Sequence, residues 1–290
     1  MLEKTSSSST DNSTSAITFT LILYILYFMY LKPVLTLDIV NDSKKYDQTI
    51  KGIYASTGIL FVCVIALQVI FNTIGFQSKC QGDFMKNFGK IFGTTFFPWF
   101  IIMGSVMTAL LVAPGFKGAF SNVLGYYAVA NSANDILVAL LVPSPDSDSD
   151  SDTKDSSSDD GQMNKTADAI MKIAGNTSLL INQITPSNFV EFWNGIIVPL
   201  MKPEYKQDSS QANELKEKLL ENVVLRDNIG EACWYIYTTI LLVTVVKSNI
   251  AEIPCQTSVA EIHESVDKVA KKQDAIDAEN KKKEAVTYKG

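Results

Sequence analysis

Two long stretches without a charged residue constrain this chain more than any other feature. They cover residues 53–76 and 91–112. An α-helix rises about 1.5 Å per residue, so about 20 apolar residues suffice to cross a hydrocarbon core of about 30 Å. A soluble domain can bury one such helix, but it rarely buries two successive helices on every face. The two stretches therefore predict membrane spans, and the alternative of two buried core helices is less favoured.

Two shorter apolar runs predict two further spans. Residues 16–37 begin with an uninterrupted apolar and aromatic run and include Lys32, whose long side chain can reach the membrane surface. Residues 229–247 contain the last apolar run, and Trp234 lies where this span would meet the lipid headgroups. The predicted fold class is therefore all-α, a polytopic membrane protein with about four transmembrane helices.

Residues 116–142 allow two interpretations. The segment is long and apolar enough to span a membrane, but Lys117, Asp135 and several asparagines interrupt it. A helix that lies in the headgroup layer fits this pattern better. Its expected interfacial anchors are four aromatic residues, Phe116, Phe120, Tyr126 and Tyr127. A further crossing of the membrane stays open as the alternative.

Polar segments flank and separate the apolar runs. We expect the Ser/Thr-rich residues 1–15 to be disordered. Residues 143–161 are mostly Asp and Ser, which predicts a disordered acidic linker whose serines can accept phosphate. Residues 163–231 show helical periodicity and form the expected small extramembrane region. Residues 256–290 combine many charges with an apolar 3-4 spacing, which is typical of an amphipathic helix.

Composition and motifs argue against catalysis, metal binding and ion transport. The chain has one histidine, and its four cysteines show no C-x-x-C spacing, so neither a zinc site nor a Ser/His/Asp or Cys/His set is expected. We also expect no cofactor, because no glycine-rich phosphate-binding loop is present. The two clearest spans lack the ionisable residues of pumps and ion-coupled carriers. A net charge of -6 argues against nucleic acid as the main partner.

The topology suggests one disulfide. Four crossings place the amino terminus, Cys80 and Cys255 on the same side of the membrane, and the distribution of Lys and Arg slightly favours the other side as cytoplasmic. Cys80 and Cys255 would then face a lumen, where disulfides persist. Each follows an apolar helix by a few residues. We therefore predict that these two cysteines are bonded.

Two segments carry a resemblance to a known family. They are RDNIGEACWYIYTTILLVTVVKSNIAEIPC, from Arg226 to Cys255, and PGFKGAFSNVLGYY, from Pro114 to Tyr127. Both resemble segments of a family of multi-span virion membrane proteins of nucleocytoplasmic large DNA viruses, such as the chlorella-infecting viruses. In that family a similar Arg-Asp/Glu-Asn…Trp-Tyr segment opens the last span, and a similar Pro-Gly-aromatic segment follows an earlier span. The Asp/Ser run and the heptad tail are not features of that family.

The resemblance implies a structural role. Such a protein lies in the internal lipid membrane beneath the capsid, and during assembly in a membrane derived from the host endoplasmic reticulum. Its implied partners are the lipid bilayer, capsid or minor capsid proteins, and a second copy of the chain in a homo-oligomer. A specific contact is expected at Arg226, Asp227, Glu231 and Trp234. The alternative for the three charged residues is a local ion pair at the membrane surface, which contributes little by itself.

A channel or transporter is the competing function. It would require polar side chains from several spans to converge on one pore, and the available ones include Gln68, Asn72 and Thr108. A membrane enzyme ranks last, because the sequence offers no catalytic set.

Overall fold

The computed structural model describes residues 5–80, 84–141, 177–207 and 209–255, and within the tail residues 263, 266–267, 269–274 and 276. In this part of the chain every regular element is a helix. The only strand-like backbone pairing among these residues is an isolated β-bridge between Leu141 and Met201. The prediction of an all-α fold is confirmed. The acidic residues 143–161 and the first residues of the expected extramembrane region lie outside the described residues.

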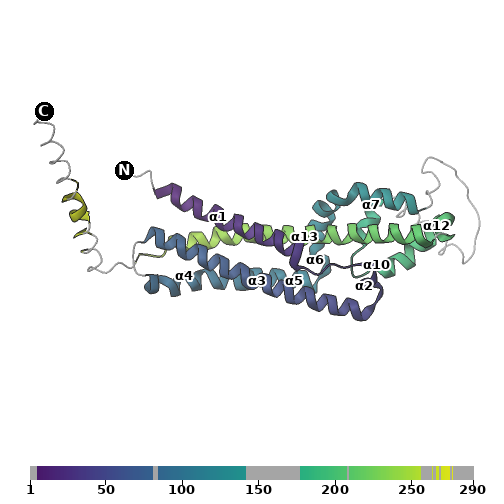
Figure 1. Cartoon of the computed structure of the whole chain (residues 1–290), viewed down its shortest axis with the longest axis horizontal. Coiled ribbons are helices and arrows are strands. Elements are labelled where there is room, and N and C mark those ends of the chain that lie inside the picture. The colour runs from purple at the N-terminus through teal and green to yellow at the C-terminus, as the bar shows by residue number, and fades with distance from the viewer. Residues whose placement is uncertain are drawn as a thin grey trace, which may run out of the picture. The chain divides into compact units, whose positions relative to one another are not determined.

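Four helical stretches are long and apolar enough to cross a membrane, as predicted. The first is α1 (Thr5–Leu26), which continues into the π-helical segment η1 (Tyr27–Leu31), and the second is α3 (Ser43–Lys79). The third consists of α4 (Phe84–Pro98), the π-helical segment η2 (Trp99–Met103) and α5 (Gly104–Val112). The fourth is α13 (Ser209–Ala251), which Figure 1 draws as one uninterrupted helix.

The remaining helices are short. They are α2 (Leu37–Asn41), α6 (Pro114–Phe120), the π-helical segment η3 (Ser121–Gly125), α7 (Tyr126–Leu140), α9 (Thr177–Gln183), α10 (Phe189–Phe192), the π-helical segment η4 (Trp193–Ile197), α11 (Val198–Leu200) and α12 (Pro203–Gln207). Pro114 occupies the first turn of α6, where a missing backbone N–H costs nothing.

The first span ends earlier than the expected residue 37. Lys32 has an extended backbone with a ψ of 123°, and residues 33–36 are not helical. The cause is Pro33, whose ring disfavours the helical conformation of the residue before it. At the other end, α1 begins at Thr5, so the expectation of disorder over residues 1–15 is wrong from Thr5 onwards. A helix already nucleated in the apolar run can extend into adjacent Ser and Thr at little cost.

The described residues belong to two compact units. One comprises Met1–Thr18, Ile65–Phe100 and Leu241–Gly290, and the other Phe19–Val64 and Ile101–Ile240. We call them unit 1 and unit 2. Unit 2 contains an apolar core, and its members come from α7, α9 to η4, Met201 and the first part of α13, before the apolar run that begins near residue 229. We call these elements, residues 126–141, 177–207 and 209–225, the helical module.

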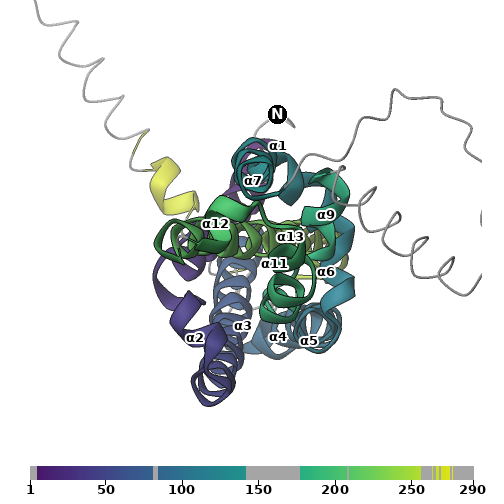
Figure 2. The same ribbon diagram turned by 90° about the vertical axis from the view of Figure 1, so that its right-hand side faces the viewer.

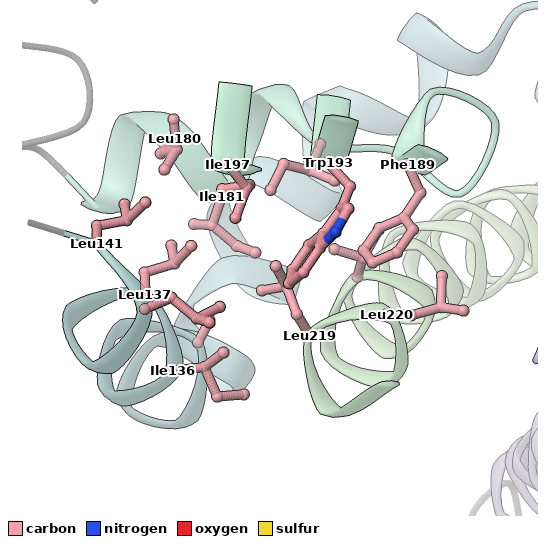
Figure 3. Packing of buried hydrophobic residues seen from close by; sticks show 14 of the residues in the cluster. Ile136, Leu137, Leu141, Leu180, Ile181, Phe189, Trp193, Ile197, Leu219 and Leu220 are labelled. Carbon is pink, nitrogen blue, oxygen red and sulfur yellow. The ribbon is translucent and has the colours of Figure 1, made fainter. Parts of the chain in front are cut away.

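The core of the helical module is well packed. Its buried side chains are Val129, Ala133, Ile136, Leu137, Leu140, Leu141, Leu180, Ile181, Ile184, Phe189, Trp193, Ile197, Met201, Ala212, Leu219, Leu220 and Val223. Figure 2 shows α7 and α12 beside α13, and Figure 3 shows Leu137, Ile181 and Trp193 pointing toward one another. Trp193 alone fills much of the space between α9 and α13.

This core corrects the interpretation of residues 116–142. The apolar face of α7 recurs at spacings of three and four, and α9 and α13 cover it instead of lipid headgroups. An amphipathic helix has the same sequence pattern in both environments, so periodicity could not distinguish them. Only the part before α7, from Phe116 to Gly125, remains outside the module.

Candidate functional site

Four charged side chains from three separate segments meet inside unit 2. Lys32 follows η1, Lys117 lies in α6, and Asp227 and Glu231 lie one turn apart on α13. The Nζ of Lys32 is 2.9 Å from Oε2 of Glu231. The Nζ of Lys117 is 2.9 Å from Oδ2 of Asp227 and 3.0 Å from Oε2 of Glu231. We call these four residues the charge cluster.

The charge cluster is buried, and Glu231 is its centre. The side chain of Glu231 is 0% exposed and that of Lys32 is 8% exposed. One carboxylate oxygen of Glu231 accepts from both lysines, while the other accepts from the hydroxyl of Tyr235 at 2.8 Å. Lys32 also donates to the side-chain oxygen of Asn228 at 2.7 Å. Two positive charges thus face two negative charges, which is how a protein tolerates ions away from water.

Lys117 is held in its charged form. Burial by itself would lower the pKa of this ammonium, but the carboxylates of Glu231 and Asp227 raise the pKa above its ordinary value. The side chain therefore keeps its positive charge at neutral pH.

Arg226 lies beside the cluster but has different partners. Its guanidinium donates to the backbone carbonyls of Ile181 and Ile184, where α9 ends. The distance from Nη2 of Arg226 to the oxygen of Ile184 is 2.5 Å. An arginine in this place adds hydrogen bonds to carbonyls at the end of a helix. Arg226 is 2% exposed, and its Nε has no hydrogen-bond partner.

The alternative interpretation, a local ion pair among Arg226, Asp227 and Glu231, does not hold for Arg226. Successive residues on a helix point about 100° apart, so Arg226 and Asp227 face different neighbours. The carboxylates pair with Lys32 and Lys117 instead. Because Arg226 and Glu231 are buried, they present no surface to a partner protein in this structure.

Two glycines let α13 approach η3 closely beside the cluster. A Cβ on Gly230 would lie 2.6 Å from the Cβ of Ser121, and one on Gly125 would overlap the backbone oxygen of Arg226. Small residues of this kind allow helix backbones to approach closely in membrane proteins. The close contact brings Lys117 within reach of Asp227 and Glu231.

Aromatic residues flank the charge cluster. The ring of Trp234 stacks on Phe116 with centroids 4.3 Å apart, and its Nε1 donates to the backbone oxygen of Phe116 at 3.1 Å. The ring of Phe120 meets Trp234 edge-on at 5.0 Å. Among the predicted anchors, Phe116 and Phe120 are thus engaged with Trp234. Tyr126 packs partly against the module core, and Tyr127 is 87% exposed.

The two segments that carry the family resemblance contact each other here. Lys117 meets Asp227 and Glu231, Ser121 meets Gly230, and Phe116 meets Trp234. Sequence reasoning missed Lys32 and Lys117 as members of the site. A signal was present, since each is an isolated lysine at the end of an apolar run and needs an acidic partner.

The predicted cysteine pair lies in unit 1. Cys80 and Cys255 form a disulfide with their Cα atoms 5.4 Å apart. Next to it, the Nζ of Lys79 donates to the backbone oxygen of Ala251 at 2.7 Å. The carboxyl ends of α3 and α13 are therefore joined twice. Cys63 and Cys233 are free thiols.

The polar residues proposed for a pore are used in helix contacts. Asn72 donates from its side chain to the hydroxyl of Thr95 at 3.2 Å, which links α3 to α4. The hydroxyl of Thr108 donates to the carbonyl of Gly104 in the same helix at 2.7 Å, and the side chain is exposed. Gln68 is buried. These contacts explain the polar residues as helix packing.

Comparison of the chain with known protein families, with curated proteins and with solved structures finds no match. Among the residues that the structure describes, no group of three or more His, Cys, Asp or Glu side chains is arranged to hold a metal ion. The interactions observed within the charge cluster are ion pairs and hydrogen bonds. A cluster of buried ions fixes the relative positions of the segments that contribute to it.

Proposed function

We propose that this protein is a structural membrane protein that holds the internal lipid membrane of a large DNA virus particle to the capsid or minor capsid proteins. The observation that carries the proposal is the charge cluster, because it ties three membrane-spanning segments to one another just beyond the point where α13 leaves the helical module.

The first argument is the continuity of α13. Leu219, Leu220 and Val223 belong to the module core, whereas Tyr237 and Ile240 on the same helix are exposed apolar residues of the span. No loop separates these regions, so a force on the module passes directly into the span. A tether to a rigid protein layer requires this property.

The second argument is that the cluster ties three spans to one another. Lys32 immediately follows the first span, Lys117 follows the third by five residues, and Glu231 precedes the apolar part of the fourth. Separating them would leave buried charges without partners, which typically costs about 3–5 kcal/mol. The spans therefore hold the module in one orientation.

The viral setting rests on the resemblance described above. The two segments that resemble the viral family lie against each other where α6 and η3 meet α13. We therefore place the protein in the virion membrane and, before that, in a membrane derived from the host endoplasmic reticulum. The capsid partner would contact the helical module, alone or with a second copy of this chain.

Amine crosslinking in purified virus particles tests this proposal. Lys206 and Lys218 are exposed lysines of the module. We expect crosslinks from them to capsid or minor capsid proteins, and we expect the protein in the internal membrane fraction. A Lys218→Arg variant should lose the crosslink at that position and keep the one at Lys206. Absence of the protein from particles would overturn the proposal, and ion flux through liposomes containing the pure protein would favour a channel.

A further inference from the structure

The segment from α6 to the start of α7 has two chemically different faces. Lys117, Ser121 and Gly125 recur every fourth residue and face α13. Phe116, Val123, Leu124 and Tyr127 are 37%, 65%, 49% and 87% exposed, and Phe116 also stacks on Trp234 of α13. We call these four residues the outer face. It is apolar and carries no charge, and apart from the contact of Phe116 with Trp234 its side chains are open on the surface of unit 2.

The position of the outer face along the chain is well defined. The third span ends at Val112, and α6 begins at Pro114. With one residue between them, α6 has to start at the boundary of the membrane. The stacking of Phe116 on Trp234 marks the same level on α13, and aromatic rings of this kind favour the headgroup region.

We propose that the outer face is a lipid-contact surface that lies in the headgroup layer and reaches the acyl boundary of the leaflet nearest the charge cluster. Phe116, Val123 and Leu124 supply apolar area, and Tyr127 supplies a ring with a polar tip suited to this depth. Because the outer face has no charge, it contacts zwitterionic and anionic phospholipids alike. It would seal the membrane around the buried ions.

Continuity with the spans identifies lipid as the occupant. In unit 2 the exposed apolar surface of the spans includes Val112 at 75% and Tyr237 at 54%, on the helices directly connected to or packed against α6. The burial pattern changes after Tyr127. From Val129 onwards the apolar residues of α7 point into the module core. The lipid contact therefore ends in the first turn of α7, just before the first buried residue of the module core.

Two valines of nearly equal exposure form a matched pair for the test. Val123 on the outer face is 65% exposed, and Val138 near the end of α7 is 64% exposed. They are 15 residues apart in the chain. Lipid contact is proposed for the first and water contact for the second.

The experiment places a nitroxide spin label at each position in the full chain in phosphatidylcholine vesicles. Cys63 and Cys233 are first replaced by alanine, which leaves the disulfide in place. Collision with oxygen, which concentrates in lipid, is compared with collision with a water-soluble nickel chelate. We expect collisions with oxygen to dominate at the V123C label and collisions with the chelate to dominate at the V138C label. The depth parameter, which is the logarithm of the ratio of the two collision rates, should therefore change sign between the two labels. A label at L124C provides a second reading of the outer face.

Three results would overturn the proposal. Chelate access at both the V123C and L124C labels would mean that water covers the outer face. Protection of these labels from both reagents would mean that a protein, including a second copy, covers it. Oxygen access that appears only in vesicles with anionic phosphatidylglycerol would mean that charge drives the contact. None of these readouts depends on the viral role, so the two proposals can fail separately.

Discussion

The helical module and the neighbouring spans of unit 2 are packed in opposite ways. The module buries leucine, isoleucine and aromatic side chains in its centre. The spans bury hydroxyl groups, as in the pairs Tyr24 with Thr239 at 2.6 Å and Tyr27 with Thr57 at 2.8 Å. Their exposed positions are apolar, including Phe19 and Ile25 at 51% and 57%. This difference in packing indicates that water surrounds the module and that lipid surrounds the spans.

The charge cluster lies where these two regions of unit 2 meet. In water a salt bridge of this kind would contribute about 0–1 kcal/mol. Inside unit 2 the same groups are shielded, so the loss of one partner has a much larger effect. We therefore expect the effect of a substitution on the free energy of unfolding to depend on whether the side chain is buried in protein, exposed to water or exposed to lipid.

Removing the central carboxylate should have the largest effect. Glu231→Gln leaves two buried ammonium groups with one carboxylate between them, so we expect the free energy of unfolding in detergent micelles to fall by about 3–5 kcal/mol. Glu214→Gln is the matched control, because Glu214 pairs with Lys218 at the surface with side chains 66% and 54% exposed. That change should leave the free energy of unfolding nearly unchanged, because water and salt screen an exposed ion pair. Equal losses would remove the distinction between buried and exposed ions.

Truncating isoleucines tests the two solvents directly. Ile181→Ala leaves a cavity in the module core and should lower the free energy of unfolding by about 2–5 kcal/mol. Ile25→Ala removes the same atoms from a side chain that is 57% exposed on α1. Since lipid is as apolar as the side chain, this second change should have little effect. A comparable loss at Ile25 would indicate a protein contact there instead of lipid.

Filling the close contact between η3 and α13 should have an intermediate effect. In Gly230→Ala the new methyl group overlaps Ser121, so we expect a loss of about 1–3 kcal/mol although alanine favours helix. Gly195→Ala is the control, because a Cβ there has no neighbour within 4 Å. Chemical denaturation of both variants measures the difference. A neutral Gly230→Ala would show that the two backbones can separate without cost.

Removing one hydroxyl between spans should have the smallest effect. Tyr24→Phe breaks the hydrogen bond to Thr239, and such bonds contribute about 0.6 kcal/mol on average in membrane proteins. The same substitution at Tyr30, which is 74% exposed, should leave stability unchanged. Parallel unfolding curves provide the comparison. Identical curves for the two variants would mean that the buried hydroxyls add no stability.

The sequence predicted the local features and missed those that depend on distant partners. The spans could be found because each is one continuous apolar run. The Lys32 to Glu231 pair joins residues 199 positions apart, and no periodicity connects them. The interfacial interpretation of α7 failed for a related reason, since the helices that cover its apolar face follow only at Thr177 and Ser209. The pairing of Cys80 with Cys255 could be predicted from the sequence, because the order of the spans alone places both cysteines on the same side of the membrane.

A double-mutant cycle on Lys32 and Glu231 tests the central claim most directly, namely that buried ion pairs hold the spans together beside the helical module. Lys32→Met with Glu231→Gln removes one charge of each sign and leaves Lys117 paired with Asp227. We predict that the double variant loses less free energy of unfolding than the two single variants lose together. The difference, which is the coupling energy between the two side chains, should be about 0.5–3 kcal/mol. Strictly additive losses in the free energy of unfolding would contradict the claim.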